Sequence, residues 1–168
     1  MGYIISVLIV GVAVFLDQFT KKLAVTYIKD TPINIVDGVF ELRYLENRGA
    51  AFGMLQNKQW FFLIISFVLL IAAIFMFIKL PHTKRMIPLR LCMIFITSGA
   101  IGNMIDRICL NYVVDFLYFK LINFPIFNVA DIYVSVSTFV LAALLLFYYK
   151  DDEVDAFFQT ASFKKKAE

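Results

Sequence analysis

The chain has 168 residues, of which 61% are hydrophobic and 17% are charged, and its mean hydropathy is +0.81. Water-soluble domains are closer to half apolar and a quarter charged, so the composition predicts an integral membrane protein, with one domain at this length. The formal charge of +3 is small, and no basic stripe with interleaved aromatic residues lies outside the apolar segments, so nucleic acid is not expected as a partner. The two cysteines and the single histidine lack metal-binding spacing, so neither a metal nor a cofactor is expected.

The first apolar run extends from residue 3 to about residue 28 and is long enough to cross a bilayer, which takes about 20 residues. A cleaved signal peptide is the alternative, but the run has no basic residues before it and no small-x-small cleavage site after it. Asp17 and Lys21 lie four residues apart near its far end, so they share a helical face and can pair. They are either an interfacial ion pair that marks the helix end or supporting residues of a site.

The next segment, approximately residues 31–53, has the pattern of a small sheet on the membrane surface. Pro32 ends the helix, Asp37-Gly38 is a hairpin turn signal, and apolar and polar residues alternate from Val39 to Tyr44. Small residues from Gly49 to Gly53 let the backbone approach another helix or an extended peptide closely. A sheet edge beside a site can bind a peptide by strand addition.

Three further spans are predicted at approximately residues 60–78, 89–106 and 126–149. The loop from Lys79 to Arg90 holds four basic residues and no acid, so the positive-inside rule places it in the cytoplasm. Four spans put both termini on that side. The basic tail, residues 150–168, agrees with this orientation, although positive charge between Lys21 and Lys58 does not. The tail either forms a short helix on the inner leaflet or is solvated.

The predicted fold class is therefore an all-α membrane protein. Four transmembrane helices carry a small extracytoplasmic β-sheet, a cradle, between the first and the second helix. All of residues 1–168 form a single membrane domain.

Three carboxylates, two amides and an arginine fall in one short window around the end of the third span and the start of the fourth. Ionisable residues in or beside a membrane span are costly, so a functional site is the default interpretation. Asn128 and Asp131 are three residues apart and share a helical face, while Asp115 lies in an apolar linking loop. If the two helices pack antiparallel, Asp115 and Asp131 face one another at the outer membrane surface. The other members of the window are Asn103, Asp106 and Arg107.

Two carboxylates a few ångströms apart cannot both ionise cheaply, so they share one proton and titrate as a pair. An aspartic protease needs such a pair. One carboxylate takes a proton from the attacking water, and the other, protonated, polarises the peptide carbonyl and helps to protonate the leaving amine. Asn103 and Asn128 can orient groups without adding charge. Arg107 either neutralises Asp106 or holds a substrate carbonyl.

Five segments of the chain, taken together and in this order, resemble bacterial lipoprotein signal peptidase, also called signal peptidase II. The segments are Asp17–Lys21, Asn47–Phe52, Gly99–Arg107, Val113–Phe116 and Phe124–Asp131. The resemblance covers nearly the whole chain and implies an aspartic endopeptidase whose catalytic dyad is Asp115 and Asp131. It also implies that further residues line the site (Asn47, Asn103, Arg107 and Asn128) or support it (Asp17, Lys21 and Asp106).

The resemblance further implies the substrate, an inhibitor and the location of the protein. The substrate is a prolipoprotein whose lipobox cysteine carries diacylglycerol, and the cut falls just before that cysteine. Globomycin, a cyclic peptide antibiotic, blocks the family by occupying the dyad. The chain is then a multi-pass protein of the bacterial inner (cytoplasmic) membrane, in contact with membrane lipid. Both termini are cytoplasmic, and the site is at the extracytoplasmic face.

Three alternatives are weighed against this interpretation. In the first, the acids only cap helix ends and pair with Arg107 and Lys120, and they form no site. In the second, the chain is a small transporter or a proton-coupled channel, in which acids at membrane depth relay ions. Against this, the acids crowd at one membrane face, and no second charged cluster lies deeper along a path. The third alternative is a non-catalytic assembly subunit.

Overall fold

The computed structural model describes residues 2–49, 58–150 and 153. Within these residues, four long helices are apolar enough to cross a membrane, as predicted. The helices are α1 (Tyr3–Tyr27), α2 (Gln59–Lys79), α3 (Ile87–Leu110) and α4 (Val129–Ala143), which continues into a π-helical turn, η4 (Leu144–Tyr148). The part of the tail for which a surface helix was one alternative, and the small residues from Ala50 to Gly53, lie outside the described residues.

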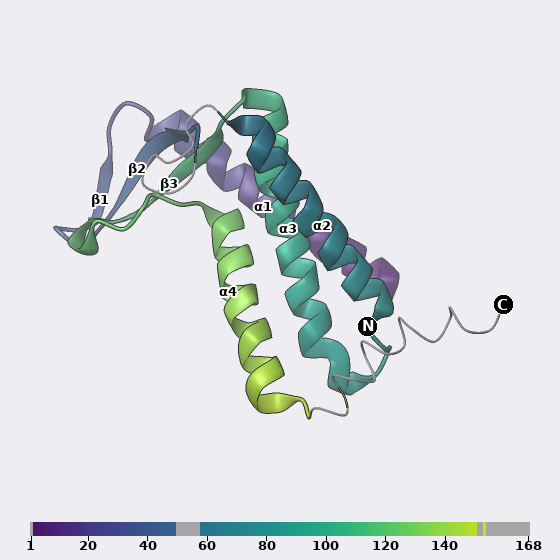
Figure 1. Cartoon of the computed structure of the whole chain (residues 1–168). Helices are drawn as coiled ribbons and strands as arrows, with labels where there is room; N and C mark the ends of the chain where they lie inside the picture. Colours follow the sequence, from purple (N-terminus) through teal and green to yellow (C-terminus); the bar gives the residue numbers. More distant parts are fainter. Residues whose placement is uncertain (1, 50–57, 151–152, 154–168) are drawn as a thin grey trace.

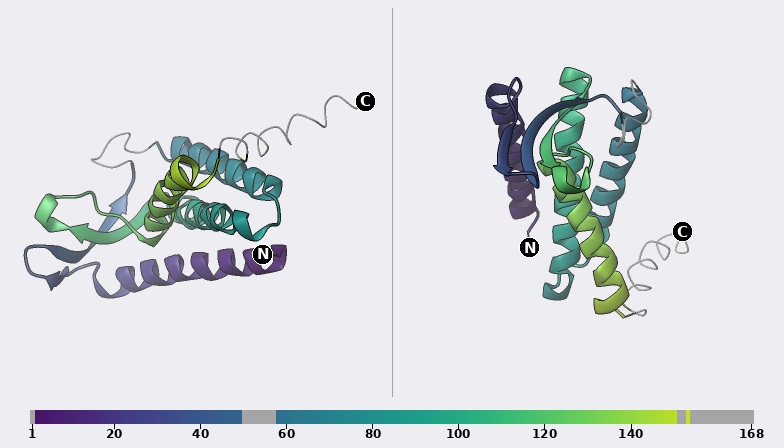
Figure 2. Two further views of the ribbon diagram at one scale, coloured as in Figure 1. Left: turned by 90° about the horizontal axis from the view of Figure 1, so that it is seen from below. Right: turned by 90° about the vertical axis from the view of Figure 1, so that its left-hand side faces the viewer.

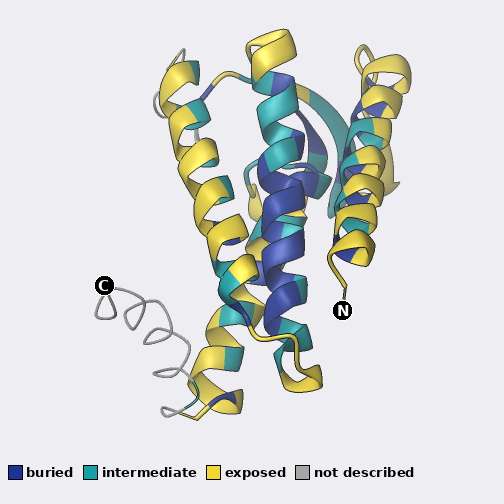
Figure 3. Cartoon of the chain, turned by 90° about the vertical axis from the view of Figure 1, so that its right-hand side faces the viewer, coloured by how far each residue is buried: buried dark blue, intermediate teal, exposed yellow. Residues whose placement is uncertain are grey.

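α3 is the central element of the bundle, and α1, α2 and α4 all pack against it (Figure 1, Figure 2). Its middle is buried, whereas the flanking helices expose most of their apolar side chains (Figure 3). The small-residue segment of α3 lets α4 approach closely, because a Cβ atom at Gly99 would overlap the carbonyl of Ala130 and the side chain of Val134. α3 and α4 are antiparallel, and α4 begins beside the stretch of α3 from Gly99 to Asn103, before α3 ends (Figure 1).

A three-stranded antiparallel sheet with the strand order β1-β2-β3 lies to one side of the bundle, next to the end of α1 (Figure 1). β1 (Ile33–Val36) and β2 (Phe40–Asn47) form the predicted hairpin, which turns at Gly38 with φ of +70°. A side chain would be strained at that angle. β3 (Val113–Phe119) pairs with β2, so the hairpin is joined by a segment more than sixty positions further along the sequence.

β3 corrects the prediction that Asp115 lies in a linking loop. Residues Val113 to Phe116 are all buried, on both faces of the strand. A strand that is buried on both faces has no alternation of apolar and polar residues, so the sequence lacked the signal that identified β2. The sheet therefore carries Asp115 on a hydrogen-bonded strand.

The opposite end of the bundle gathers the start of α1, the connection between α2 and α3, and the end of α4. The rings of Tyr3 and His82 lie 4.9 Å apart. The hydroxyl of Tyr149 donates to the carbonyl of Arg85 at 2.7 Å. The two ends of the helical bundle are therefore distinct: one carries the sheet, and the other carries the basic connection (Figure 1).

Candidate active site

Asp115 and Asp131 meet where β3 passes the first turn of α4. Asn128 is the N-cap of α4, and its side-chain oxygen accepts from the backbone N–H of Asp131 at 3.0 Å. The Asp131 carboxylate accepts in return from the backbone N–H of Asn128 at 3.1 Å, which completes a capping box. The side-chain amide of Asn128 donates to Asp115 at 2.6 Å. A single residue therefore contacts both aspartates.

Two more amides complete the contacts of the two carboxylates. Asn103, on α3, donates to Asp131 at 2.8 Å, and Asn47, at the end of β2, donates to Asp115 at 2.8 Å. Asn128 also donates to the side-chain oxygen of Asn103 at 3.2 Å. Each oxygen of the two acids thus accepts an N–H group from a neutral donor. These contacts hold the carboxylates in place without neutralising the pair.

Lys21 fixes the direction of the Asn103 amide. Its Nζ lies 3.0 Å from the side-chain oxygen of Asn103, and an ammonium group can only donate hydrogen bonds. The NH₂ group of Asn103 must then face the other way, toward Asp131. The orientation of this amide, which coordinates alone would not establish, follows from the charge of its neighbour.

Lys21 also forms a buried ion cluster with two further acids. Its Nζ lies 2.9 Å from Asp17 and 3.0 Å from Asp106, and all three side chains are at most 3% exposed. Gln18 links the two acids, because its amide lies 2.9 Å from Asp106 and 3.1 Å from Asp17. The predicted pairing of Asp17 with Lys21 is therefore present, inside the bundle rather than at a solvated helix end.

The two acids of this cluster hold the backbone next to each aspartate of the pair. Asp17 accepts from the N–H of Ala130 at 2.9 Å, one residue before Asp131. Asp106 accepts from the N–H of Val114 at 3.0 Å, one residue before Asp115. The Lys21 cluster thus connects the first turn of α4 to β3 through α1 and α3.

The two other basic residues in this region do not pair with the acids in the way considered above. Arg107 does not neutralise Asp106, whose partner is Lys21. It donates to the backbone carbonyl of Asn103 at 3.3 Å and lies over the ring of Phe62, 5.4 Å from its centroid. Lys120 pairs with Glu41, at 3.1 Å. Arg107 therefore lies near the acid pair, and within the described residues it forms no ion pair with a carboxylate.

The surroundings of Asp115 favour its protonated form. Its side chain is 1% exposed. Burial, followed by the nearby charge of Asp131, raises the pKa of Asp115 to about 7, against the lowering effect of the Asn47 and Asn128 hydrogen bonds. A buried acid beside a second acid is the arrangement in which one proton is shared at neutral pH. The site can therefore present a general acid and a general base together.

Two residues of this region were not identified as candidates from the sequence. Gln18 lies three residues before Lys21, so helical spacing could have placed it on the same face. Phe62, at the start of α2, gave no signal, because one phenylalanine in an apolar span is indistinguishable from a lipid-facing one.

Comparisons with known proteins agree with this geometry. Residues 9–147 match the model of a family described as signal peptidase (SPase) II. The chain is 48% identical to a lipoprotein signal peptidase of Caldanaerobacter subterraneus subsp. tengcongensis over 84% of this chain and 96% of that one. It is 43% identical to a lipoprotein signal peptidase of Clostridioides difficile over 84% and 95%. A solved structure described as a bacterial membrane enzyme superposes with a TM-score of 0.74 at 31% identity, over 86% of this chain and 88% of that one.

Proposed function

Because this chain belongs to the signal peptidase II family, we propose that Asp115 and Asp131 are the catalytic pair of its activity. That activity is the cleavage of prolipoprotein signal peptides by an aspartic peptidase. The observation that carries the assignment is the set of amides around the two acids. Asn128 contacts both carboxylates, at 2.6 Å for Asp115 and through the capping box for Asp131. Neither acid has an ion-pair partner among the described residues.

The two acids take different roles in this proposal. Asp131 lies in the first turn of α4, where the helix dipole favours negative charge, and it accepts two N–H groups. It is the general base that takes a proton from the attacking water. Asp115 lies on a strand, with its pKa raised, and is the general acid that polarises the scissile carbonyl and then protonates the leaving amine. Arg107, which has no carboxylate partner among the described residues, is proposed to hold a carbonyl of the substrate.

The substrate is proposed to be a prolipoprotein that already carries diacylglycerol on its lipobox cysteine, cut just before that cysteine. The acid pair lies where α4 begins, beside the paired strands β2 and β3. A lipid-anchored substrate is confined to the bilayer, and its cleavage point lies next to the anchored cysteine. A site at the start of a transmembrane helix can therefore reach that point. The cradle supplies strands along which an extended peptide can lie. Globomycin is expected to occupy the same acid pair.

The orientation in the bacterial cytoplasmic membrane is proposed from the charges at the end opposite to the site. Lys84 and Arg85 lie in the connection between α2 and α3, beside the start of α1 and the end of α4. The positive-inside rule places this end, and both termini, in the cytoplasm. In intact cells, a membrane-impermeant maleimide should then label Cys109, which is exposed at the end of α3 near the site. A Cys109→Ser, Thr83→Cys variant should react only after permeabilisation, and the reverse pattern would contradict this orientation.

The function is tested with purified protein and a defined precursor. We expect cleavage of a diacylglyceryl-modified precursor, with the new N-terminus at the lipidated cysteine, and inhibition by globomycin. The same precursor without the lipid should be cut much more slowly. Equal cleavage of both forms would contradict the proposed substrate, and cleavage that globomycin does not affect would contradict a common site.

A further inference from the structure

The sheet ends, on the side away from the acid pair, in a group of exposed apolar side chains, here called the apolar tip. The tip lies at the end of β3 and in the following turn, η3 (Lys120–Ile122), next to the hairpin turn. Its members and their exposed fractions are Val36 51%, Phe119 43%, Leu121 69%, Ile122 68% and Phe124 48%.

Contacts within the sheet hold the apolar tip in place. The N–H of Leu121 donates to the carbonyl of Val39 at 3.3 Å, which fastens η3 to the hairpin turn. The rings of Phe40 and Phe119 lie 5.0 Å apart across β2 and β3. Lys120 pairs with the buried carboxylate of Glu41 at 3.1 Å. These contacts keep large apolar side chains exposed on the surface, and exposing apolar surface to water is unfavourable.

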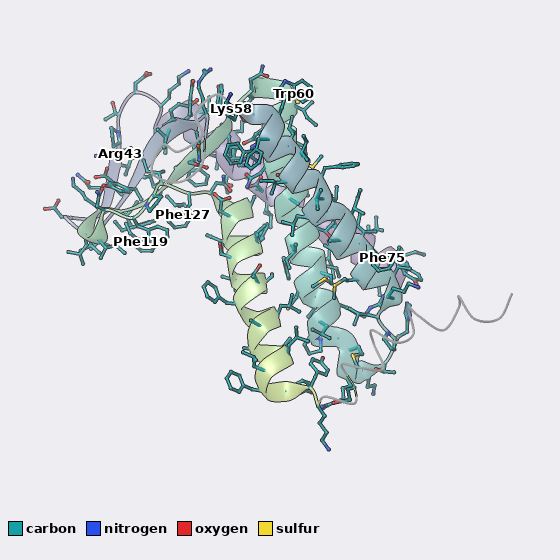
Figure 4. The ribbon with its side chains drawn as sticks, in the orientation of Figure 1. Arg43, Lys58, Trp60, Phe75, Phe119 and Phe127 are labelled. Carbon is teal, nitrogen blue, oxygen red and sulfur yellow. The ribbon has the colours of Figure 1, made fainter. Side chains whose placement is uncertain are left out.

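The tip lies at the level at which α4 starts. Phe127, two residues before α4 begins, pairs with Leu117 of β3, so the sheet is fastened to the outer end of this helix. The sheet extends sideways from the bundle instead of continuing along the helices (Figure 1). At its far end, around Phe119, side chains made of carbon alone point to the side on which α4 runs (Figure 4).

We propose that the apolar tip inserts into the lipid leaflet that surrounds the start of α4. The outer face of α4 exposes Ile132, Val136 and Phe139, which face lipid if this helix spans the membrane. The apolar tip lies to the side of this apolar face of α4, at the level of the helix's N-terminal end. Lys120, half exposed beside the tip, can reach the headgroups while its stem lies along apolar surface. The occupant of this surface is therefore membrane lipid.

The insertion gives the sheet a second membrane attachment, remote from the helices. β3 runs from the tip to Asp115, and β2, its partner, ends at Asn47. A sheet held at both of its ends keeps the acid pair at one depth relative to the headgroups. The inference concerns the placement of the sheet and does not depend on the catalytic roles proposed above.

The insertion is tested by tryptophan fluorescence in vesicles of phosphatidylcholine brominated at defined positions of its acyl chains. The chain has one tryptophan, Trp60, so a Trp60→Phe background leaves a single probe at Leu121→Trp. Phe139→Trp, 78% exposed in the middle of α4, is the control for the bilayer interior. Asp30→Trp is the control for water. Asp30 is an exposed residue of the connection between α1 and β1, which curves away from the tip (Figure 1). Acrylamide serves as the aqueous quencher.

The expected result is that Leu121→Trp loses fluorescence to brominated lipid, more to bromines near the headgroup than to bromines near the chain end. Phe139→Trp should show the opposite order, and Asp30→Trp should respond to acrylamide alone. If Leu121→Trp responds to acrylamide alone, the tip is in water and the proposal is wrong. If neither quencher reaches it, protein covers the tip, as a second copy of this chain would, and the proposal is equally wrong.

Discussion

Replacing Lys21 by methionine is the sharpest test of how the site is held together. Methionine is unbranched and only one atom shorter than lysine, and it carries no charge. The ammonium group of Lys21 contacts Asp17 at 2.9 Å, Asp106 at 3.0 Å and the side-chain oxygen of Asn103 at 3.0 Å. The change leaves two buried carboxylates without their cation and frees the Asn103 amide to reverse.

The size of the effect follows from the burial of the cluster. Removing one partner of a buried ion pair costs about 3–5 kcal/mol, because the remaining charge stays buried without compensation. Lys21 is 3% exposed and compensates two acids, so the loss should fall in or above this range. Lys22, the next residue, is exposed, and Lys22→Met should change stability by less than about 0.5 kcal/mol. Adding Asp106→Asn to Lys21→Met removes one uncompensated charge and should recover part of the loss.

The assay is unfolding in mixed micelles with a rising mole fraction of SDS, followed by far-UV circular dichroism. Precursor cleavage should be measured on the fraction that remains folded. Lys21→Met should be clearly less stable than Lys22→Met. Its kcat should also fall, because the Asn103 amide that donates to Asp131 is no longer held in one orientation. If the two variants were equally stable, the buried cluster would not hold β3 and α4 together, and the reasoning would be refuted.

Two further predictions concern the packing and the titration of the site. A Cβ atom at Gly102 would overlap the Asp17 carboxylate, so Gly102→Ala should destabilise the fold by about 1–3 kcal/mol and lower cleavage; unchanged SDS unfolding would contradict this. Asn47→Ala removes an N–H group that favours ionised Asp115, so the pKa of Asp115 should rise further. Because the acid must be protonated to act, the alkaline limb of the kcat/KM profile should move to higher pH. A shift to lower pH would exclude Asp115 as the acid.

The sequence revealed those parts of the site that depend on helical spacing. Asp17 and Lys21 are four residues apart and form the predicted ion pair. Asn128 and Asp131 are three residues apart and were predicted to share a helical face, and they contact each other at the start of α4. The contact of Lys21 with Asp106 could not be read from spacing, because it depends on how α1 packs against α3. The pairing of β3 with β2 was hidden for a different reason. A strand buried on both faces carries no alternation, so Asp115 was expected on a loop.

The Lys21 cluster explains why so many polar residues occur in an otherwise apolar chain. Its two acids accept hydrogen bonds from the backbone N–H groups of Ala130 and Val114, and each of these residues precedes one aspartate of the proposed pair. The three amides Asn47, Asn103 and Asn128 then orient the carboxylates themselves. The charges of the cluster pair with one another, and the hydrogen-bond donors on the two acids are neutral. This separation preserves the shared proton that the proposed mechanism needs.

The cleavage rate of Asp115→Asn measures the central claim most directly. The matched control is Asp37→Asn, at an exposed position of the hairpin turn. With both variants folded by circular dichroism, the rate on a diacylglyceryl-modified precursor should fall by about 10²–10⁴-fold for Asp115→Asn, the usual contribution of a positioned general acid. Asp37→Asn should cleave at the wild-type rate. A folded Asp115→Asn variant that cleaves as fast as the control would show that the acid pair does not perform the hydrolysis.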